Sequence, residues 1–510
     1  MRIVVPAAVL SLTAAAVAQV PTPSVSPRVA PRAEYVLTTG VTGIVPANRH
    51  WSQATGNDTS LFVFGGRTGT AGTGSKRNDL YEFDATTSVW TEHNLDGDPN
   101  APPQRYRNGL AWDPIGNRLL MFGGEDAAAA LLADTWEWIP ATNTWNNITP
   151  ASSPVARRFH SMSYDPASSG ILMFGGDDGT NMLGDTWLLV ANTWVQLAPT
   201  TAPAARSHHS LVTRGDFGDV FLCAGHDNAA TNRVHFLDSW RWDGAATTWV
   251  QIVPTTAAVP ASMAGNQAVY DAERQVVVMT GGQGISTSTA QTGGAYGSAY
   301  GGSPSGWTSE FDCVTNEWRL YGGATFDTAD PVIGRASRYY SAFVPATSRI
   351  YFWGGQDPTG QGASLVAMKE YQASPLASAS SFGAGCNSSV GPLGLASDNN
   401  PWTGRTWSLT GSGFANGSLA FGVVGFGTQS TPLSAFHPAG GAGCNLLVTN
   451  DAVLLLLPVA GQATLGVTLP NNAGLAGLVL DSQMLTIELA GPNISLIAST
   501  NAVTGTLGAN

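Results

Sequence analysis

The stretch SYDPASSGILMFGG, residues 163–176, decides the fold of this chain. It contains a short apolar run that ends in a pair of glycines, and this pattern returns five more times. The other copies are LFVFGG, LLMFGG, VFLCAG, VVVMTGG and IYFWGG, which end at Gly66, Gly124, Gly225, Gly282 and Gly355. Their last glycines are 49 to 73 residues apart, so the chain is a tandem repeat with a period of roughly 50 residues.

Each apolar run has the same neighbours along the chain. A strand-like segment precedes it, and a segment led by aspartate usually follows, at Asp79, Asp134, Asp185 and Asp238. A tryptophan-bearing segment then ends the repeat, at Trp90, Trp145, Trp194, Trp249 and Trp318. Four strand-like segments per copy predict one four-stranded blade, and six copies predict six blades. These residues resemble the kelch repeat over residues 48–371, and the resemblance implies an all-β, six-bladed β-propeller.

The sixth repeat lacks a tryptophan-bearing segment. Its third strand is expected at residues 368–371, and the chain that follows, residues 374–385, is rich in Pro, Ser, Gly and Ala. An open strand edge promotes aggregation, so another segment must complete this blade. The segment EYVLT, residues 34–38, has strand composition. We predict that it forms the outer strand of the sixth blade and closes the ring.

The composition argues against a nucleic-acid partner, and the N-terminal residues indicate export. The 510 residues carry a net charge of −12 and include only two lysines, so no nucleic-acid partner is expected. Residues 1–18 have the apolar core and small-residue end of a secretory signal peptide, and residues 19–33 form a Pro-rich linker. The mature chain is therefore predicted to be secreted, extracellular or periplasmic, with no transmembrane segment.

A second domain follows the propeller. We assign residues 34–374 to the propeller, 375–385 to a linker and 386–510 to a small β-sandwich with few charges. Cys386 and Cys444 lie in matching Gly-x-Gly-Cys settings, which favours a disulfide between them. Cys223 and Cys313 are expected to be buried free thiols. The tail also resembles a C-terminal β-module of secreted bacterial proteins, for which surface attachment and a stabilising cap are both open roles.

Strand alternation predicts which side chains share one face of the ring. The glycine pairs, the leading aspartates and the starts of the first strands should lie together, on a side that we call face A. Arginines and histidines begin those strands, and the candidate ligand-binding residues are Arg105, Arg157, Arg206, Arg338, His160 and His209. In one interpretation the arginines pair with the aspartates. In the other they line a mouth for a carboxylated, sulfated or phosphorylated ligand.

Histidines raise the question of a metal. His208, His209 and His226 fall in one blade and are candidate ligands for Zn²⁺ or Cu²⁺, although their spacing matches no structural zinc pattern. The kelch resemblance also includes copper-radical oxidases similar to galactose oxidase, which need a Tyr–His pair and a Cys linked to Tyr. No Tyr-His dipeptide occurs here, and Cys223 and Tyr270 are expected at opposite ends of their strands. No cofactor is otherwise predicted.

The sequence therefore predicts a secreted, non-catalytic binding or adhesion module that presents propeller loops to an extracellular protein or glycan. Long Gly/Ser/Thr-rich loops at residues 68–76 and 284–305, the second carrying Tyr296 and Tyr300, are candidate contact regions. The alternatives are a metal-dependent oxidase of the galactose-oxidase-like type and a carbohydrate-active propeller. The sequence sets no oligomeric state.

Overall fold

The computed structural model describes residues 33–51, 53–68, 75–227, 236–255, 267–280, 308–321, 340–355, 368–373 and 377–508. Several sequence predictions lie outside these residues. They are the signal peptide, residues 19–32 of the linker, the candidate ligand residue Arg338, and Tyr296 and Tyr300 of the second long loop. Apart from four short 3₁₀ turns, the regular structure of the described residues is β-strand.

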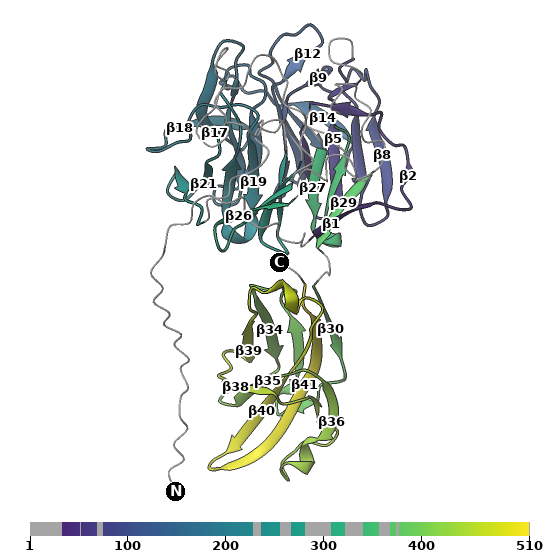
Figure 1. Ribbon diagram of the computed structural model, residues 1–510, viewed down its shortest axis with the longest axis vertical. Coiled ribbons are helices and arrows are strands. Elements are labelled where there is room, and N and C mark those ends of the chain that lie inside the picture. Colours follow the sequence, from purple (N-terminus) through teal and green to yellow (C-terminus); the bar gives the residue numbers. More distant parts are fainter. Residues whose placement is uncertain are drawn as a thin grey trace.

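Six sheets form the first domain, one for each sequence repeat (Figure 1). The first blade holds β4 (Ala54–Gly56), β5 (Ser60–Phe64), β7 (Leu80–Asp84) and β8 (Val89–Asn94), with β2 (Thr42–Gly43) parallel to β8. The second holds β10 (Gly109–Asp113), β11 (Arg118–Phe122), β13 (Thr135–Ile139) and β14 (Thr144–Asn147). The third holds β15 (Ser161–Asp165), β16 (Gly170–Asp177), β17 (Met182–Val190) and β18 (Thr193–Leu197).

The remaining three blades repeat this order. The fourth holds β19 (Ser210–Arg214), β20 (Asp219–Cys223), β21 (Ser239–Asp243) and β22 (Thr248–Ile252). The fifth holds β23 (Ala268–Asp271), β24 (Val276–Thr280), β25 (Thr308–Asp312) and β26 (Glu317–Tyr321). The sixth holds β27 (Tyr340–Val344), β28 (Arg349–Trp353), β29 (Lys369–Ala373) and β1 (Ala33–Leu37). Two short strand pairs lie at face A. One is formed by β3 (Arg49–His50) with β6 (Arg67–Thr68), and the other by β9 (Arg105–Tyr106) with β12 (Glu125–Asp126).

The innermost strands close into a ring. Each contacts the next in the cyclic order β4, β10, β15, β19, β23, β27 and back to β4. This arrangement is a six-bladed β-propeller, which confirms the predicted fold class. The predicted closure is also confirmed, because β1 pairs antiparallel with β29, with Leu37 opposite Lys369.

Tryptophans join neighbouring blades. The indole nitrogens of Trp194, Trp249 and Trp318 donate to the hydroxyls of Thr135, Thr186 and Ser239, each in the preceding blade. Each hydroxyl belongs to a residue of a third strand, and Thr135 and Ser239 are the first residues of theirs. A buried indole N–H needs such an acceptor, so the repeated tryptophan sets the spacing between blades as well as filling it.

Side chains cover the open inner edges of the ring. Gln53 accepts from the backbone N–H of Leu110 and donates to the carbonyl of His160, which connects three blades. Gln267 accepts from the N–H groups of Ala54 and Ser341. Each inner strand is a sheet edge with free backbone groups, and these amides satisfy them within the channel.

The C-terminal domain is built from two main sheets. One contains β30 (Ser378–Phe382), β41 (Asn493–Thr506), β40 (Val479–Ala490), β35 (Leu419–Gly425) and β38 (Ala452–Leu456). The other contains β33 (Gly394–Ser397), β34 (Thr406–Ser412) and β39 (Gln462–Thr468). Short pairs are formed by β31 (Asn387–Ser388) with β32 (Gly391–Pro392) and by β36 (Thr428–Pro432) with β37 (Asn445–Val448). Trp407, Leu409, Leu465 and Met484 are among the buried residues of the core.

One boundary differs from the sequence prediction. The linker was expected to run over residues 375–385, but β30 lies within it and pairs along its whole length with β41, with Ser378 opposite Thr506. Except for Phe382 at its end, the strand is composed of small residues and is largely exposed, so its composition matches that of a linker. The C-terminal domain therefore begins before residue 386.

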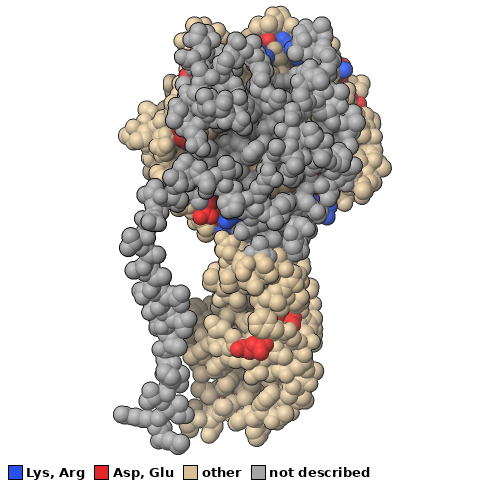
Figure 2. Space-filling model, viewed as in Figure 1, with Lys and Arg blue, Asp and Glu red and all other residues tan. Residues whose placement is uncertain are grey.

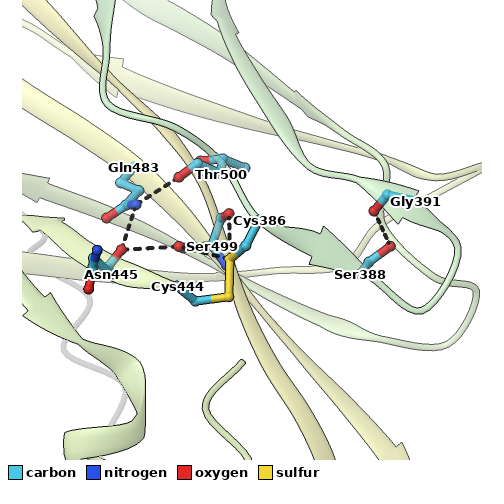
Figure 3. The surroundings of a disulfide bond; sticks show 8 residues. All are labelled: Cys386, Ser388, Gly391, Cys444, Asn445, Gln483, Ser499 and Thr500. Carbon is cyan, nitrogen blue, oxygen red and sulfur yellow. Dashed lines mark hydrogen bonds between the residues drawn. A yellow bond between two sulfur atoms is a disulfide. The ribbon is translucent and has the colours of Figure 1, made fainter. Parts of the chain in front are cut away.

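The predicted disulfide is present. Cys386 and Cys444 are bonded, with 5.5 Å between their Cα atoms (Figure 3). Both attach to β41, since the N–H of Cys386 donates to the carbonyl of Ser499 at 2.8 Å and the Ser499 hydroxyl donates to the carbonyl of Asn445. Closing a loop of this length contributes about 4 kcal/mol in the chain-entropy model. Cys223 and Cys313 are buried and unpaired as thiols, as predicted.

The two domains meet through Arg405. Its guanidinium donates to the carbonyl of Arg274 at 2.7 Å and to the carboxylate of Asp312 at 3.2 Å. Both acceptors belong to the fifth blade, at the end of the ring opposite face A. Asn400 adds a hydrogen bond to Glu273 in the same turn. The C-terminal domain thus lies against that end of the propeller (Figure 1).

Candidate binding site at the channel mouth

Four buried ion pairs repeat around face A. Arg49, Arg105, Arg157 and Arg206 lie shortly before the first strands of four successive blades and are fully buried. They pair with Asp79, Asp134, Asp185 and Asp238, each through both carboxylate oxygens. The doubled glycines and the leading aspartates therefore share one face, as strand alternation predicts.

The same guanidinium groups also hold the backbone corners. Nη1 of Arg157 donates to the carbonyl of Gly175 at 3.0 Å, and its Nε donates to the carbonyl of Val155. Arg105 and Arg206 make the equivalent contacts. Burial alone raises the pKa of Asp134, Asp185 and Asp238, but the hydrogen bonds and charges of their arginines outweigh it and lower the pKa.

These contacts settle what three predicted site residues do. Arg105, Arg157 and Arg206 are buried and committed to aspartates and carbonyls, so they do not line an open mouth. The interpretation in which arginine and aspartate satisfy each other describes them. The physical reason is that a buried guanidinium requires a paired carboxylate, and the repeat supplies one in each blade.

A different set of residues forms the mouth. Trp51, Arg107, Phe159 and His208 each lie two positions after a buried arginine, and we call them the collar. All four have a left-handed backbone, with φ of 70°, 63°, 58° and 58°. The N–H groups of Arg107, Phe159 and His208 donate to the carbonyls of Trp51, Arg107 and Phe159, so a chain of hydrogen bonds runs from blade to blade.

The collar side chains contact one another over the channel. The rings of Phe159 and His208 stack with centroids 3.7 Å apart, and Trp51 lies 5.3 Å from Phe159. The guanidinium of Arg107 sits 5.0 Å from the Trp51 ring and 4.5 Å from the Phe159 ring. Cation–π contacts of this kind hold the arginine in a defined place. His226 extends the stack, 4.6 Å from His208.

Behind the collar, one buried carboxylate, that of Glu125, contacts several basic side chains. Glu125 accepts from Arg107 at 2.8 Å, from Lys76 at 3.3 Å and from Arg158, and also from the hydroxyl of Tyr106. Burial raises the pKa of Glu125, but these hydrogen bonds and positive charges lower it to about 2. Arg158 also pairs with Asp177. Three cations thus share the two carboxylates of Glu125 and Asp177.

A pocket of about 440 Å³ lies along the channel behind the collar. Trp51, Arg107, Phe159 and His208 line it at face A, and residues such as Asp58 and Pro345 line it at the far end. The predicted residues His160 and His209 form part of its wall and are almost completely buried. Their rings stand edge-on to Phe122 and Phe174, each with 5.5 Å between centroids.

Burial sets the charge of these two histidines. Desolvation and the neighbouring Arg206 lower the pKa of His209 to about 3. Desolvation, with a contribution from Arg157, also lowers the pKa of His160 well below its ordinary value. Both rings are therefore neutral near pH 7, and they contribute wall surface to the pocket rather than positive charge.

The predicted metal ligands are only partly brought together. His208 and His226 are neighbours, but their rings stack, and their Nδ1 atoms contact the Ser207 hydroxyl and the Asp227 carbonyl. His209 follows His208 and lies in the buried wall instead. Within the described ranges, no three His, Cys, Asp or Glu side chains converge on a point that suits a metal ion.

The two residues considered for a copper-radical site, Cys223 and Tyr270, have different partners and lie apart. The Cys223 thiol contacts the sulfur of Met279 at 3.4 Å, and burial raises the pKa of this thiol above its usual range. The Tyr270 hydroxyl donates to Asp216 at 2.5 Å. Cys223 pairs with Ser210 at the start of β19, whereas Tyr270 lies near the end of β23. The two residues therefore lie toward opposite ends of the blade strands.

The ring of six four-stranded blades with repeated Arg–Asp pairs defines a kelch-type propeller. The chain belongs to the kelch-repeat family, since the family model described as "KLHDC2/KLHL20/DRC7 Kelch-repeats domain" matches residues 50–282 and 112–335. Kelch domain-containing protein 3 of Bos taurus is 30% identical over 228 residues, which are 42% of this chain and 56% of that protein.

Two further relatives match shorter stretches. Dynein regulatory complex subunit 7 of Chlamydomonas reinhardtii is 31% identical over 19% of this chain and 8% of its own length. The Leucine-zipper-like transcriptional regulator 1 homolog of Drosophila melanogaster is 31% identical over 21% and 11%. The chain thus spans little more than half of the first relative and small parts of the others. In the part of the chain that is described, no helix has the length and apolarity needed to cross a bilayer.

Proposed function

We propose that this protein is an exported, non-catalytic binding module that holds a protein or glycan partner at the collar. Membership of the kelch-repeat family supports a role in protein interaction. The signal-peptide-like residues 1–18 and the disulfide support export, because disulfides persist in oxidising compartments. Purification from the culture medium or periplasm, with a mature N-terminus at Gln19, is the expected result of fractionation and N-terminal sequencing.

The left-handed backbone of the collar is the observation that carries this proposal. Non-glycine residues in this conformation cost about 1–3 kcal/mol each, and such strain is concentrated at functional sites. Here it fixes two aromatic rings, a histidine and an arginine at one opening. Rigid aromatic and arginine side chains are the usual anchors of an interface, since little conformational entropy is lost when they bind.

The chemistry of the mouth favours an anionic partner. Lys76, Arg107 and Arg158 outnumber the two carboxylates they contact, although the chain as a whole is acidic. The rings of Trp51 and Phe159 beside them offer faces for a sugar or an aromatic side chain. A carboxylated or sulfated glycan or an acidic peptide segment therefore fits the collar best.

The proposal is tested by binding to a glycan array and to an array of acidic and neutral peptides. Phe159→Ala and Arg107→Ala should each weaken binding to the best array ligand at least tenfold, because each removes a central anchor. Leu95→Ala is the matched control, since Leu95 is exposed on the propeller outside the collar. Equal binding by wild type and by both folded collar variants would overturn the proposal.

A further inference from the structure

The C-terminal domain exposes an apolar strand at the edge of its larger sheet. Among the described residues, β38 pairs with β35 on one side and with no strand on the other. Val453 is 55% exposed, Leu454 42% and Leu455 60%, and Leu457 directly after the strand is 71% exposed. Successive strand residues face opposite sides of a sheet, so leucines are exposed on both.

The apolar surface continues across the sheet. Leu455 is paired with Phe421, which is paired in turn with Leu485, so three strands contribute to one row. Leu419, Ile487 and Ile497 form a parallel row. These side chains lie on the face of the sheet opposite the one on which Gly422 faces Leu465, and Leu485 and Ile497 are partly buried against the domain core.

Charges that normally protect a sheet edge are missing from this one. Proteins block exposed edges with lysine, proline or an inward charge. In residues 377–510 Arg405 is the only lysine or arginine, and it is bound to the propeller. Asp451, at the start of β38, is the nearest charge in sequence. Figure 2 shows this domain as mostly uncharged on the face drawn.

We propose that β38 pairs antiparallel with β38 of a second copy of this chain, about a two-fold axis at Leu454. In this register Val453 of each copy lies opposite Leu455 of the other, and Asp451 lies opposite Leu457. The two carboxylates are then kept a strand length apart, whereas a parallel pair would place them side by side. A strand that is apolar throughout complements itself, as an isologous interface requires.

The pairing also extends the apolar row across the two copies. A two-fold axis perpendicular to the sheet keeps the same face outward in both copies, so the row that begins at Leu455 of one copy continues into Val453 of the other. Two five-stranded sheets become one continuous sheet, and the free N–H and C=O groups of both edges are satisfied. The proposal is independent of what the collar binds.

Sedimentation equilibrium of the full chain tests the proposal. Wild type should have twice the chain mass, while Leu454→Lys and Leu454→Glu should each sediment as monomers, because each places two like charges at the axis. A mixture of these two variants should regain the doubled mass, since lysine then faces glutamate. Leu455→Lys is a second disrupting variant, and Leu95→Lys on the propeller is the control that should remain dimeric.

Two results would overturn the proposal. The first is a monomeric wild type across the accessible concentration range. If that monomer also co-sediments with neutral phosphatidylcholine vesicles, the apolar strand is assigned to a lipid surface. The second is a doubled mass that persists in folded Leu454→Lys and Leu455→Lys.

Discussion

Arg157 illustrates how this fold uses charge. It is fully buried, yet it connects the corner of Gly175, the start of its own strand and Asp185. Charged residues are scarce in the sequence, and the propeller commits many of them to such contacts. Removing one partner leaves the other charge buried and unpaired, which is the costly event.

Arg157→Ala should therefore lower the free energy of unfolding by about 3–5 kcal/mol. Urea denaturation followed by tryptophan fluorescence measures this change. Arg241→Ala is the control, because Arg241 and Asp243 form an exposed pair 3.2 Å apart, and its loss should cost about 0–1 kcal/mol. Similar midpoints for the two variants would contradict a structural role for Arg157.

His209 should make stability depend on pH. Its pKa is lowered from 6.5 to about 3 in the folded chain, so between these values the unfolded chain binds more protons. Its contribution is complete above pH 6.5 and is lost as pH falls toward 3, at about 1.4 kcal/mol per pH unit. His209→Gln should show a shallower loss between pH 6.5 and 4 in urea titrations, whereas an unchanged slope would show that other groups cause it.

The corner glycine Gly66 should tolerate no side chain. Its φ is +90°, and a Cβ atom would lie 2.4 Å from the Tyr340 hydroxyl and 3.2 Å from the carbonyl of His50. Gly66→Ala should cost clearly more than the roughly 1–3 kcal/mol of backbone strain alone. Gly97→Ala measures that strain by itself, because Gly97 has φ of +85° and open space around it. If urea denaturation gave the same loss of unfolding free energy for Gly66→Ala and Gly97→Ala, steric crowding at Gly66 would be contradicted.

At the scale of elements, repetition made the propeller predictable. Six copies of one pattern predict six blades, and the missing strand of the last blade predicts where β1 must pair. The strand β30 was not predicted, because an exposed edge strand with only Ser and Ala before Phe382 carries no apolar alternation. Apolar alternation in a strand arises because one of its faces is buried. A strand that is exposed on both faces therefore has the composition of a linker.

Three of the four collar residues were not predicted, for a different reason, and His208 was considered only as a metal ligand. Sequence analysis selected arginines and histidines by residue type, and the repeat placed Arg157 and His160 in the interior. Trp51, Arg107, Phe159 and His208 share a position but no chemistry, and their common feature is a backbone angle. The available signal was the position of these residues, two after each repeated arginine, where all four repeats carry a different residue.

The strand β1 should be needed for a closed ring. A chain that starts at Thr39 lacks the strand that covers β29, so it should unfold at lower urea concentration and scatter more light on storage. A chain that starts at Ala33 retains the strand and is the matched control. Equal midpoints and equal scattering for the two chains would contradict closure by β1.

At the scale of the whole molecule, Arg405 links the two domains. It is buried at the interface and reaches two residues of the fifth blade, Arg274 and Asp312. Asp312 also pairs with Arg319, and although burial raises the pKa of Asp312, Arg405, Arg319 and the backbone N–H groups of Thr315 and Val314 together lower it. One side chain thus ties the sandwich to a charge network that belongs to the propeller.

Arg405→Ala should weaken this link by about 2–5 kcal/mol, since it leaves the Asp312 carboxylate with one partner fewer. Small-angle X-ray scattering should report a larger radius of gyration, and the domains should unfold in two separate transitions. Asn400→Ala removes only the hydrogen bond to Glu273 and should give a smaller change. An unchanged scattering profile for Arg405→Ala would show that other contacts hold the domains.

The position of β1 also has a consequence for biosynthesis. Residues 33–37 leave the ribosome before any of the six blades. Their partner, residues 369–373, leaves it only after the first five blades have been translated. The ring can therefore close only late in synthesis, and until then the nascent chain carries an incomplete last wedge. Contacts between distant parts of a sequence form slowly, and such a chain depends on protection until synthesis of its last wedge is complete.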